Sequence, residues 1–371
     1  MGILDPRLAV KPFEYDWAIR YWRDVHSSHW LPEEISMTED VQDFHTKLTA
    51  AERWVSGGTL KGFTQTEVLI GDFWTKICHW IPKPEIIMMA MSFAAWESIH
   101  IMAYSIMNDS LGLNDYEAFL QDPMCKAKLE RLMGAGLDSR SRTQAKLITS
   151  LQELRGRLLS GSTSGDGDAA IISQTLGHLS VSTADQAATP EEIARAIAIF
   201  SAFGEGVSLF SSFAVLLNFT RMPRNCLKGM GKQISYSVRD ESLHSEAGCR
   251  IFNTIVADYP DVLSARLKDD VREAAHITVK LESDFIENLF VDGPVADLRP
   301  DDLKAFIRHR TDTKLGDIGF APEFKGSYTV EQLTRMEWFD YLTVGRGLQD
   351  FFDQQPTEYA SKMTTDWNSI W

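Results

Sequence analysis

The sequence predicts an all-α protein with a large apolar core. Apolar residues recur at helical spacing along most of the chain, and period-2 alternation bounded by hairpin turns is not evident. Of the 371 residues, 44% are hydrophobic, which is enough for one large domain or two ordinary ones. The formal net charge of −15 argues against binding of nucleic acid through a broad basic surface.

The composition also indicates a compartment. The four cysteines are scattered and form no CxxC pair, so we expect reduced thiols in a cytoplasmic protein. Residues 1–17 contain acidic side chains and no apolar segment of signal length, so export is not expected. No window of about eighteen uninterrupted apolar residues occurs, and therefore no membrane span is expected.

Helix signals divide the chain into successive segments. The Pro-Glu-Glu sequence that begins at Pro32 resembles a helix start, and the pair Gly57 and Gly58 is expected to separate two helices. Two charged helices are expected within 115–159, and part of 160–190 is interpreted as a loop. The other expected helices span residues 38–55, 59–80, 84–108, 191–219, 225–257, 262–291 and 299–311.

We interpret residues 1–350 as one helical domain that includes the loop. Residues 351–371 are polar, with isolated aromatic side chains and no core-forming period. We expect this segment to be a flexible C-terminal tail.

Two polar residues interrupt the long apolar helical run at 88–104. Glu97 and His100 are three positions apart, so they lie on one face of a helix, close enough to bind one ion. A carboxylate in an apolar environment is costly unless a cation meets it. One misplaced charge beside one hydrogen-bonded core histidine also explains a lone Glu-x-x-His pair, so the other candidate ligands decide the interpretation.

Four further residues supply the missing ligands. Glu241 and His244 repeat the Glu-x-x-His spacing. Glu67 precedes Glu97 by 30 residues, and Glu205 precedes Glu241 by 36. Glu205 lies in an almost wholly apolar helix, where an unpaired carboxylate is strongly unfavourable. Each half of the chain therefore offers a helix with one carboxylate and then a Glu-x-x-His helix, which is the ligand set of a dinuclear metal site in a four-helix bundle.

A third Glu-x-x-His pair, Glu273 and His276, is rejected as a ligand pair. Charged residues surround it, which is typical of an exposed helical face. No free carboxylate on an apolar helix precedes it at the required interval, because Glu241 already pairs with His244.

Four motifs together resemble a known family. They are TQTEVLIGDFW, ESIHIMAYSIMNDSLGL, GEGVSLFSSF and RDESLH, followed by the late stretch FIRHRTDTKLGDIGFAPEF. From about Trp30 to Gly326 the chain resembles the radical-generating small (β) subunit of class I ribonucleotide reductase. This resemblance implies a ferritin-like helical bundle around a dinuclear metal centre.

The resemblance also implies which residues bind the metals. Many relatives have Asp at the position of Glu67, and Thr66 is a rival for that position, but a hydroxyl is a poor replacement for a carboxylate. The implied metal ligands are Glu67, Glu97, His100, Glu205, Glu241 and His244.

Tyr104 is the residue that the resemblance implies is oxidised to a stable radical. It follows Glu97 by seven residues, which places it two helical turns away on the same face. From spacing alone, an ordinary core tyrosine explains it equally well. Leu209 and Phe213 fit an apolar radical pocket. Ser237 makes the pocket more polar, which leaves open whether the oxidising equivalent rests on Tyr104 or on the metals.

The resemblance further implies a route for radical transfer. Asp240 would accept a hydrogen bond from His100 and reach Trp30, and a ligand imidazole needs such a partner. The alternatives are that Asp240 is a surface acid paired with Arg239 and that Trp30 is a core aromatic residue. Tyr359, in the tail, would relay the radical to the large subunit.

The expected protein is a homodimer that passes a radical to a large (α) subunit for deoxyribonucleotide synthesis and binds neither nucleic acid nor membrane. An iron pair is favoured, although the same ligands suit Mn/Fe or Mn/Mn. Trp367, Ile370 and Trp371 are candidate anchors for the large subunit. A ligand-binding di-metal oxidase or a ferritin-type metal store would share the metal site. The transfer residues and the aromatic tail argue against the oxidase, and the length of the chain and its docking tail argue against the ferritin.

Overall fold

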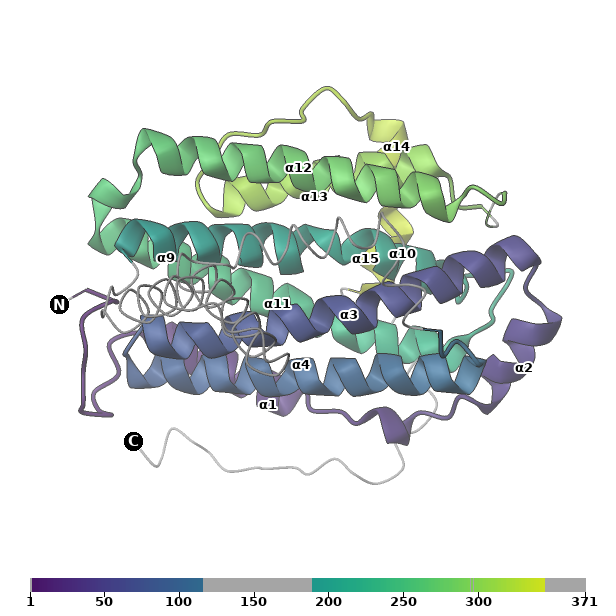
Figure 1. The fold of residues 1–371 in the computed structure, drawn as a ribbon, viewed down its shortest axis with the longest axis horizontal. Helices are drawn as coiled ribbons and strands as arrows, with labels where there is room; N and C mark the ends of the chain where they lie inside the picture. The colour runs from purple at the N-terminus through teal and green to yellow at the C-terminus, as the bar shows by residue number, and fades with distance from the viewer. Residues whose placement is uncertain (1, 116–188, 294, 296, 344–371) are drawn as a thin grey trace, which may run out of the picture.

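The computed structural model describes residues 2–115, 189–293, 295 and 297–343, which form a bundle of helices (Figure 1). The only β pairing within these residues is an isolated bridge between Val295 and Leu298. The all-α prediction is therefore confirmed. The charged helices expected after residue 115, the loop at 160–188 and the tail at 351–371 lie outside the described residues.

Two long helices, α3 (Ala50–Trp80) and α4 (Pro84–Leu111), form a hairpin (Figure 1). A capping box starts α3: the Thr49 hydroxyl accepts a hydrogen bond from the Glu52 N–H, and the Glu52 carboxylate accepts one from the Thr49 N–H. The second helix of the hairpin, α4, stops at Gly112, whose φ of 73° is the left-handed conformation that favours glycine.

The break expected at Gly57 and Gly58 is wrong, because α3 continues through both residues. A Cβ atom on Gly57 would lie 3.2 Å from the Leu113 side chain, and one on Gly58 would lie 3.4 Å from Leu289. The bare backbone thus lets Leu113 approach Gly57 closely, whereas the contact of Leu289 with Gly58 has an ordinary van der Waals length. Each glycine costs a helix about 1 kcal/mol relative to alanine.

The helix expected at 38–55 is likewise two elements, α2 (Thr38–Thr46) and the start of α3. Asp40 of α2 is buried, and its carboxylate accepts hydrogen bonds from the main-chain N–H groups of Gly229 and Met230, at the start of α11 (Lys228–Asp258). The elements before α3 are α1 (Asp16–Ser27), the 3-10 turn η1 (Pro32–Glu34) and α2 (Thr38–Thr46).

The helix expected at 191–219 is a helical run that begins just after Thr189, with a second capping box. Its middle segment is π-helical, which the sequence period does not predict, and every residue of that segment is buried. Its three parts are α9 (Pro190–Ile197), the π-helix η2 (Ala198–Ser208) and α10 (Phe210–Asn218).

The long helix α11 (Lys228–Asp258) runs antiparallel to α4. Asp258, at the end of α11, accepts hydrogen bonds from the Ile3 N–H and the Tyr15 hydroxyl. Glu85, at the start of α4, accepts one from the Tyr15 N–H. The N-terminal segment therefore joins the start of α4 to the end of α11.

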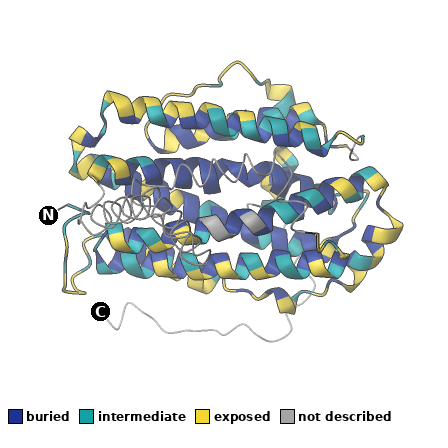
Figure 2. Cartoon of the chain, viewed as in Figure 1, coloured by how far each residue is buried: buried dark blue, intermediate teal, exposed yellow. Residues whose placement is uncertain are grey.

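The helices that follow α11 pack against the π-helical segment, on the side opposite the α3–α4 hairpin (Figure 1). Buried residues face the middle of the bundle, and exposed ones face outward (Figure 2). The helix expected at 299–311 continues to Asp317. The elements are η3 (Pro260–Val262), α12 (Ala265–Leu289), α13 (Pro300–Asp317), α14 (Val330–Thr334) and α15 (Glu337–Thr343).

Two helical runs of the described residues are long and apolar enough, by length and composition alone, to cross a membrane. They are α4 and the run Pro190–Asn218. The apolar window is half-buried in α4 and entirely buried in the second run. Core helices of bundles have this composition, and both runs contribute carboxylates to the site described below.

Gly248 is a position where an added methyl group is expected to destabilise the fold. A Cβ atom there would lie 1.9 Å from Ser201 Oγ and 2.3 Å from Ser201 Cβ, so α11 and η2 would have to separate. We expect Gly248→Ala to lower the free energy of unfolding by about 1–3 kcal/mol. Gly316→Ala is the matched control, because a Cβ atom there meets nothing within 4 Å. Denaturant unfolding of the metal-free variants tests this, and equal losses in both would contradict it.

Candidate metal centre

Six buried side chains meet at the centre of the bundle and form two overlapping groups. One ligand atom from each member of a group lies within 4.8 Å of the others. Glu97 and Glu241 belong to both groups, as expected for carboxylates shared between two adjacent ions. The groups are Glu67, Glu97, His100 and Glu241, and then Glu97, Glu205, Glu241 and His244.

Four helical segments supply these side chains. Glu67 comes from α3 and Glu205 from η2, whereas α4 and α11 each supply a Glu-x-x-His pair. The i, i+3 spacing places both members of a pair on the same helix face. Gly71 lets α3 and α4 approach each other closely at the level of Glu97, since a Cβ atom on Gly71 would lie 3.3 Å from Glu97 Cβ.

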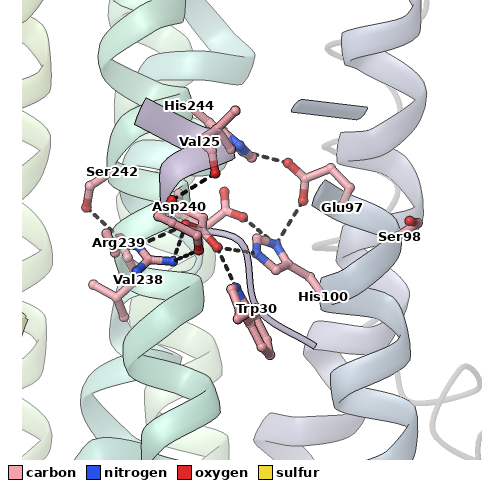
Figure 3. Close-up of polar contacts among 12 residues, drawn as sticks. Val25, Trp30, Glu97, Ser98, His100, Val238, Arg239, Asp240, Ser242 and His244 are labelled. Carbon is pink, nitrogen blue, oxygen red and sulfur yellow. Dashed lines mark hydrogen bonds and ion pairs between the residues drawn. The ribbon is translucent and has the colours of Figure 1, made fainter. Parts of the chain in front are cut away.

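The two imidazoles point toward the shared carboxylates (Figure 3). His100 Nδ1 lies 3.1 Å from Glu97 Oε2 and 3.0 Å from Glu241 Oε1. His244 Nδ1 lies 2.7 Å from Glu97 Oε1 and 4.0 Å from Glu205 Oε1. Nitrogen and oxygen atoms therefore converge on a small volume from opposite helices.

Several of these buried atoms have no hydrogen-bond partner among the described residues. They include both carboxylate oxygens of Glu67, Oε2 of Glu205, Oε2 of Glu241 and Nε2 of His244. Unpaired buried polar atoms are costly and require an explanation. Carboxylate oxygens and imidazole nitrogens are suitable ligands for first-row divalent ions, so the donor set fits a pair of such ions.

Four carboxyl groups lie close together in this buried site, and the pKa of each is shifted from its usual value. Burial raises the pKa of Glu67 and of Glu205 well above the usual range, and repulsion from Glu241 and Glu97 adds to this. Burial, then Glu97, raises the pKa of Glu241 to about 7. Burial also opposes ionisation of Glu97. The charges and hydrogen bonds of His244 and His100 outweigh this effect and lower the pKa of Glu97 to about 2. The metal-free site therefore holds protons that metal binding would displace.

Trp74 is a contact of this site that the sequence interpretation missed. Its indole N–H donates a hydrogen bond to Glu205 Oε1, from α3 to η2. Trp74 follows Glu67 by seven residues and so lies on the same face of α3, which is the one local signal that could have identified it.

Trp30 and His100 both contact Asp240 beside the carboxylates (Figure 3). Trp30 Nε1 donates a hydrogen bond of 2.8 Å to Asp240 Oδ2, and His100 Nε2 lies 3.4 Å from the same oxygen. Arg239 binds the other oxygen, Oδ1, at 3.0 Å and also donates to the Ser28 carbonyl. Asp240 is thus buried and paired with Arg239 at the same time. Burial opposes ionisation of Asp240, but hydrogen bonding with His100 and the Arg239 charge lower its pKa overall.

Tyr104 lies beside the site within apolar walls. Its ring stacks on Phe63 at 4.8 Å, and Phe63 stacks in turn on Phe213 at 4.8 Å. Leu209 is buried as well. The Tyr104 hydroxyl is buried with no hydrogen-bond partner among the described residues. Burial, followed by the Glu67 charge, raises its pKa well above the usual range.

The structure separates the rejected candidates from this cluster. Glu273 and His276 are exposed on α12. Thr66 donates its hydroxyl to the Gly62 carbonyl of its own helix. Tyr359 lies outside the described residues.

The fold and the site together define a helical-bundle protein with a buried carboxylate and histidine centre suited to two metal ions. The family model described as "Ribonucleotide reductase, small chain" matches residues 7–164 and 169–331. The chain belongs to this family, and its ferritin-like fold is the one that the sequence resemblance predicts.

Named relatives agree with this membership. The chain is 33% identical to a probable ribonucleoside-diphosphate reductase small subunit of Invertebrate iridescent virus 3, over 98% of this chain and 88% of that protein. It is 24% identical to the ribonucleoside-diphosphate reductase subunit beta of Chlamydia pneumoniae, over 96% and 91%.

Solved structures share the fold. A putative class I ribonucleotide reductase from Bacillus halodurans superposes with a TM-score of 0.68 at 17% identity, over 88% of this chain and 99% of that chain. A dimanganese(II)-NrdF from Streptococcus sanguinis superposes with a TM-score of 0.63 at 17% identity, over 88% and 96%.

Proposed function

We propose that this chain is the radical-generating small subunit of a ribonucleoside-diphosphate reductase and that the six central side chains hold its dinuclear metal centre. The unpaired carboxylate and imidazole atoms at the centre of the bundle are the observation that carries this proposal. Family membership supports it independently.

The bound metals would supply one-electron oxidising power after reaction with oxygen or a reduced-oxygen oxidant. We propose iron in both positions. Mn/Fe and Mn/Mn are the alternatives, because the ligand types suit all three and affinity order alone does not select among them.

The protein itself would orient the ligands and keep the site dry. Asp240 faces Nε2 of His100, which leaves Nδ1 of that ring directed toward the metals. Trp74 fixes one oxygen of Glu205 by its indole N–H. The stacked rings of Phe63 and Phe213 exclude water from Tyr104, the proposed electron donor.

The radical equivalent would leave the site through His100, Asp240 and Trp30. Asp240 Oδ2 lies 2.8 Å from Trp30 Nε1 and 3.4 Å from His100 Nε2, so polar contacts connect these three side chains. We propose that the tail at 351–371 docks on the large subunit, that Tyr359 relays the radical there, and that the small subunit acts as a homodimer. Ribonucleotide reduction itself would take place on the large subunit, in the cytoplasm.

A matched pair of variants tests the metal site. We expect Glu97→Gln to lower the metal content well below the two ions per chain of the unchanged protein, because Glu97 belongs to both ligand groups. Glu273→Gln alters the exposed Glu-x-x-His pair and should leave the metal content unchanged. Metal analysis measures this, and equal metal contents in the two variants would contradict the ligand assignment.

Ribonucleotide reduction with the large subunit tests the function. We expect the aerobically metal-loaded protein to support the reaction, Glu273→Gln to match it and Glu97→Gln to fail. If the unchanged protein binds two metals but supports no ribonucleotide reduction, the proposed function is wrong, and a di-metal oxidase of a small molecule takes its place.

A further inference from the structure

A second layer of polar groups lies one helical turn from the metal ligands. Tyr104 follows His100 by four residues on α4, and Ser237 precedes Glu241 by four residues on α11. His100 and Glu241 are in contact, with Nδ1 and Oε1 3.0 Å apart. Because α4 and α11 are antiparallel, both displacements run in the same direction along the bundle, by about 6 Å. Tyr104 and Ser237 therefore occupy the same level, on facing helices.

Ser237 differs from the other serines of α11. Ser235 and Ser242 each donate their hydroxyl to a main-chain carbonyl one turn back, and Ser245 donates to a carbonyl of η2. The Ser237 hydroxyl is completely buried, yet it has no such partner among the described residues. Buried helical serines normally bond to a carbonyl of the preceding turn. The hydroxyl of Ser237 is thus left for a group outside its own helix.

Tyr104 carries a second hydroxyl in the same situation as that of Ser237. Its hydroxyl is completely buried and also lacks a partner among the described residues, and the aromatic walls offer no conventional one. The Ser237 hydroxyl acts to lower the pKa of Tyr104, against the larger effect of burial, which raises it. Two buried hydroxyls without other partners among the described residues therefore lie at the same level of the bundle, between the aromatic walls and the carboxylate cluster.

We propose that the Ser237 hydroxyl is the hydrogen-bond partner of the Tyr104 oxygen and positions it for one-electron oxidation. This inference rests on the proposed function of Tyr104. Before oxidation, the phenol donates its hydrogen bond to Ser237 Oγ. Oxidation breaks the phenolic O–H bond and passes one electron and one proton to the reduction of O₂ to water, for which the bound metal ions and an external reductant would supply the other three electrons and the solvent the other three protons. The remaining phenoxyl oxygen has only lone pairs, so the Ser237 hydroxyl rotates and donates to it.

Three variants of the full-length, metal-loaded protein test this pairing. Electron–nuclear double resonance of the tyrosyl radical in D₂O should show coupling to one exchangeable deuteron in the unchanged protein. Ser237→Ala should lose this coupling, and Ser237→Thr should retain it because threonine keeps the hydroxyl. Ser235→Ala is the control, since Ser235 is bonded to the backbone of its own helix. Unchanged coupling in Ser237→Ala, or none in the unchanged protein, would overturn the proposal.

A measurement on the metal-free protein separates this inference from the proposed function. Infrared spectra of protein with isotope-labelled tyrosine contain a C–O band of Tyr104, which the Tyr104→Phe variant identifies by its loss. This band should shift in Ser237→Ala and stay unchanged in Ser235→Ala. If no radical forms in the unchanged protein, the radical assignment fails while the infrared shift still decides the hydrogen bond. A band that does not shift in Ser237→Ala contradicts the inference.

Discussion

Tyr104→Phe is expected to reduce to background both the organic-radical signal near the free-electron g value and ribonucleotide reduction with the large subunit. Phenylalanine keeps the ring that stacks on Phe63, so the fold and the metal content should be unchanged. It lacks the hydroxyl whose loss of a proton makes one-electron oxidation accessible. Electron paramagnetic resonance after aerobic metal loading, together with a reduction assay, measures the effect.

Tyr21→Phe is the matched control for this prediction. Tyr21 is also a buried tyrosine, but its hydroxyl donates to Glu246, away from the metal cluster. The control should keep the radical signal and the activity. If Tyr104→Phe retained both oxidising capacity and nucleotide reduction, the oxidising equivalent would rest on the metals and the assignment of Tyr104 would be wrong.

Deletion of residues 351–371 is expected to abolish complex formation with the large subunit and to leave metal binding intact. The deleted segment contributes none of the six central side chains. It contains Trp367, Ile370 and Trp371, and apolar anchors of this kind each contribute about 2 kcal/mol or more when they fill a partner's pocket. Calorimetric titration of the large subunit, with metal analysis of the same preparation, measures both effects.

Tyr359→Phe distinguishes docking from radical transfer in the same tail. This variant should form the complex with unchanged affinity but should not support ribonucleotide reduction. A synthetic peptide of residues 351–371 should also compete with the intact small subunit for the large one. Unchanged affinity after the deletion would contradict the docking role of the tail.

Much of the fold was predictable because helical period and helix caps are local signals. The helical run expected at 191–219 begins at Pro190, one residue before the expected start. The error at Gly57 and Gly58 has a non-local cause: the segments that pack on these glycines, through Leu113 and Leu289, are distant in sequence. The capping box at Thr49 was the local signal that would have placed the start of α3 correctly.

The candidate site was predictable where burial makes a charge conspicuous. Glu205 stands out in its apolar helix because an isolated buried carboxylate is unfavourable. The contact of Trp74 with Glu205 was not predictable, since it joins residues 131 positions apart. The π-helical geometry of η2 was not predictable either, because apolar residues on all sides of a helix leave no period to measure. The unpaired state of Ser237 depends on a side-chain orientation that only the structure supplies.

The sharing of Glu241 between both ligand groups also constrains when the metals can be loaded during synthesis. The ribosome releases the chain from its N-terminus, and 144 residues separate Glu97 from Glu241. At about 5–20 residues per second, roughly 7–30 s pass between the two. Throughout that interval, the nascent α3–α4 hairpin carries Glu67, Glu97 and His100 without the carboxylate that completes either group. Neither ligand group is therefore complete before Glu241 has been synthesised, about two-thirds of the way along the 371-residue chain, and both metal positions can be filled only after that point.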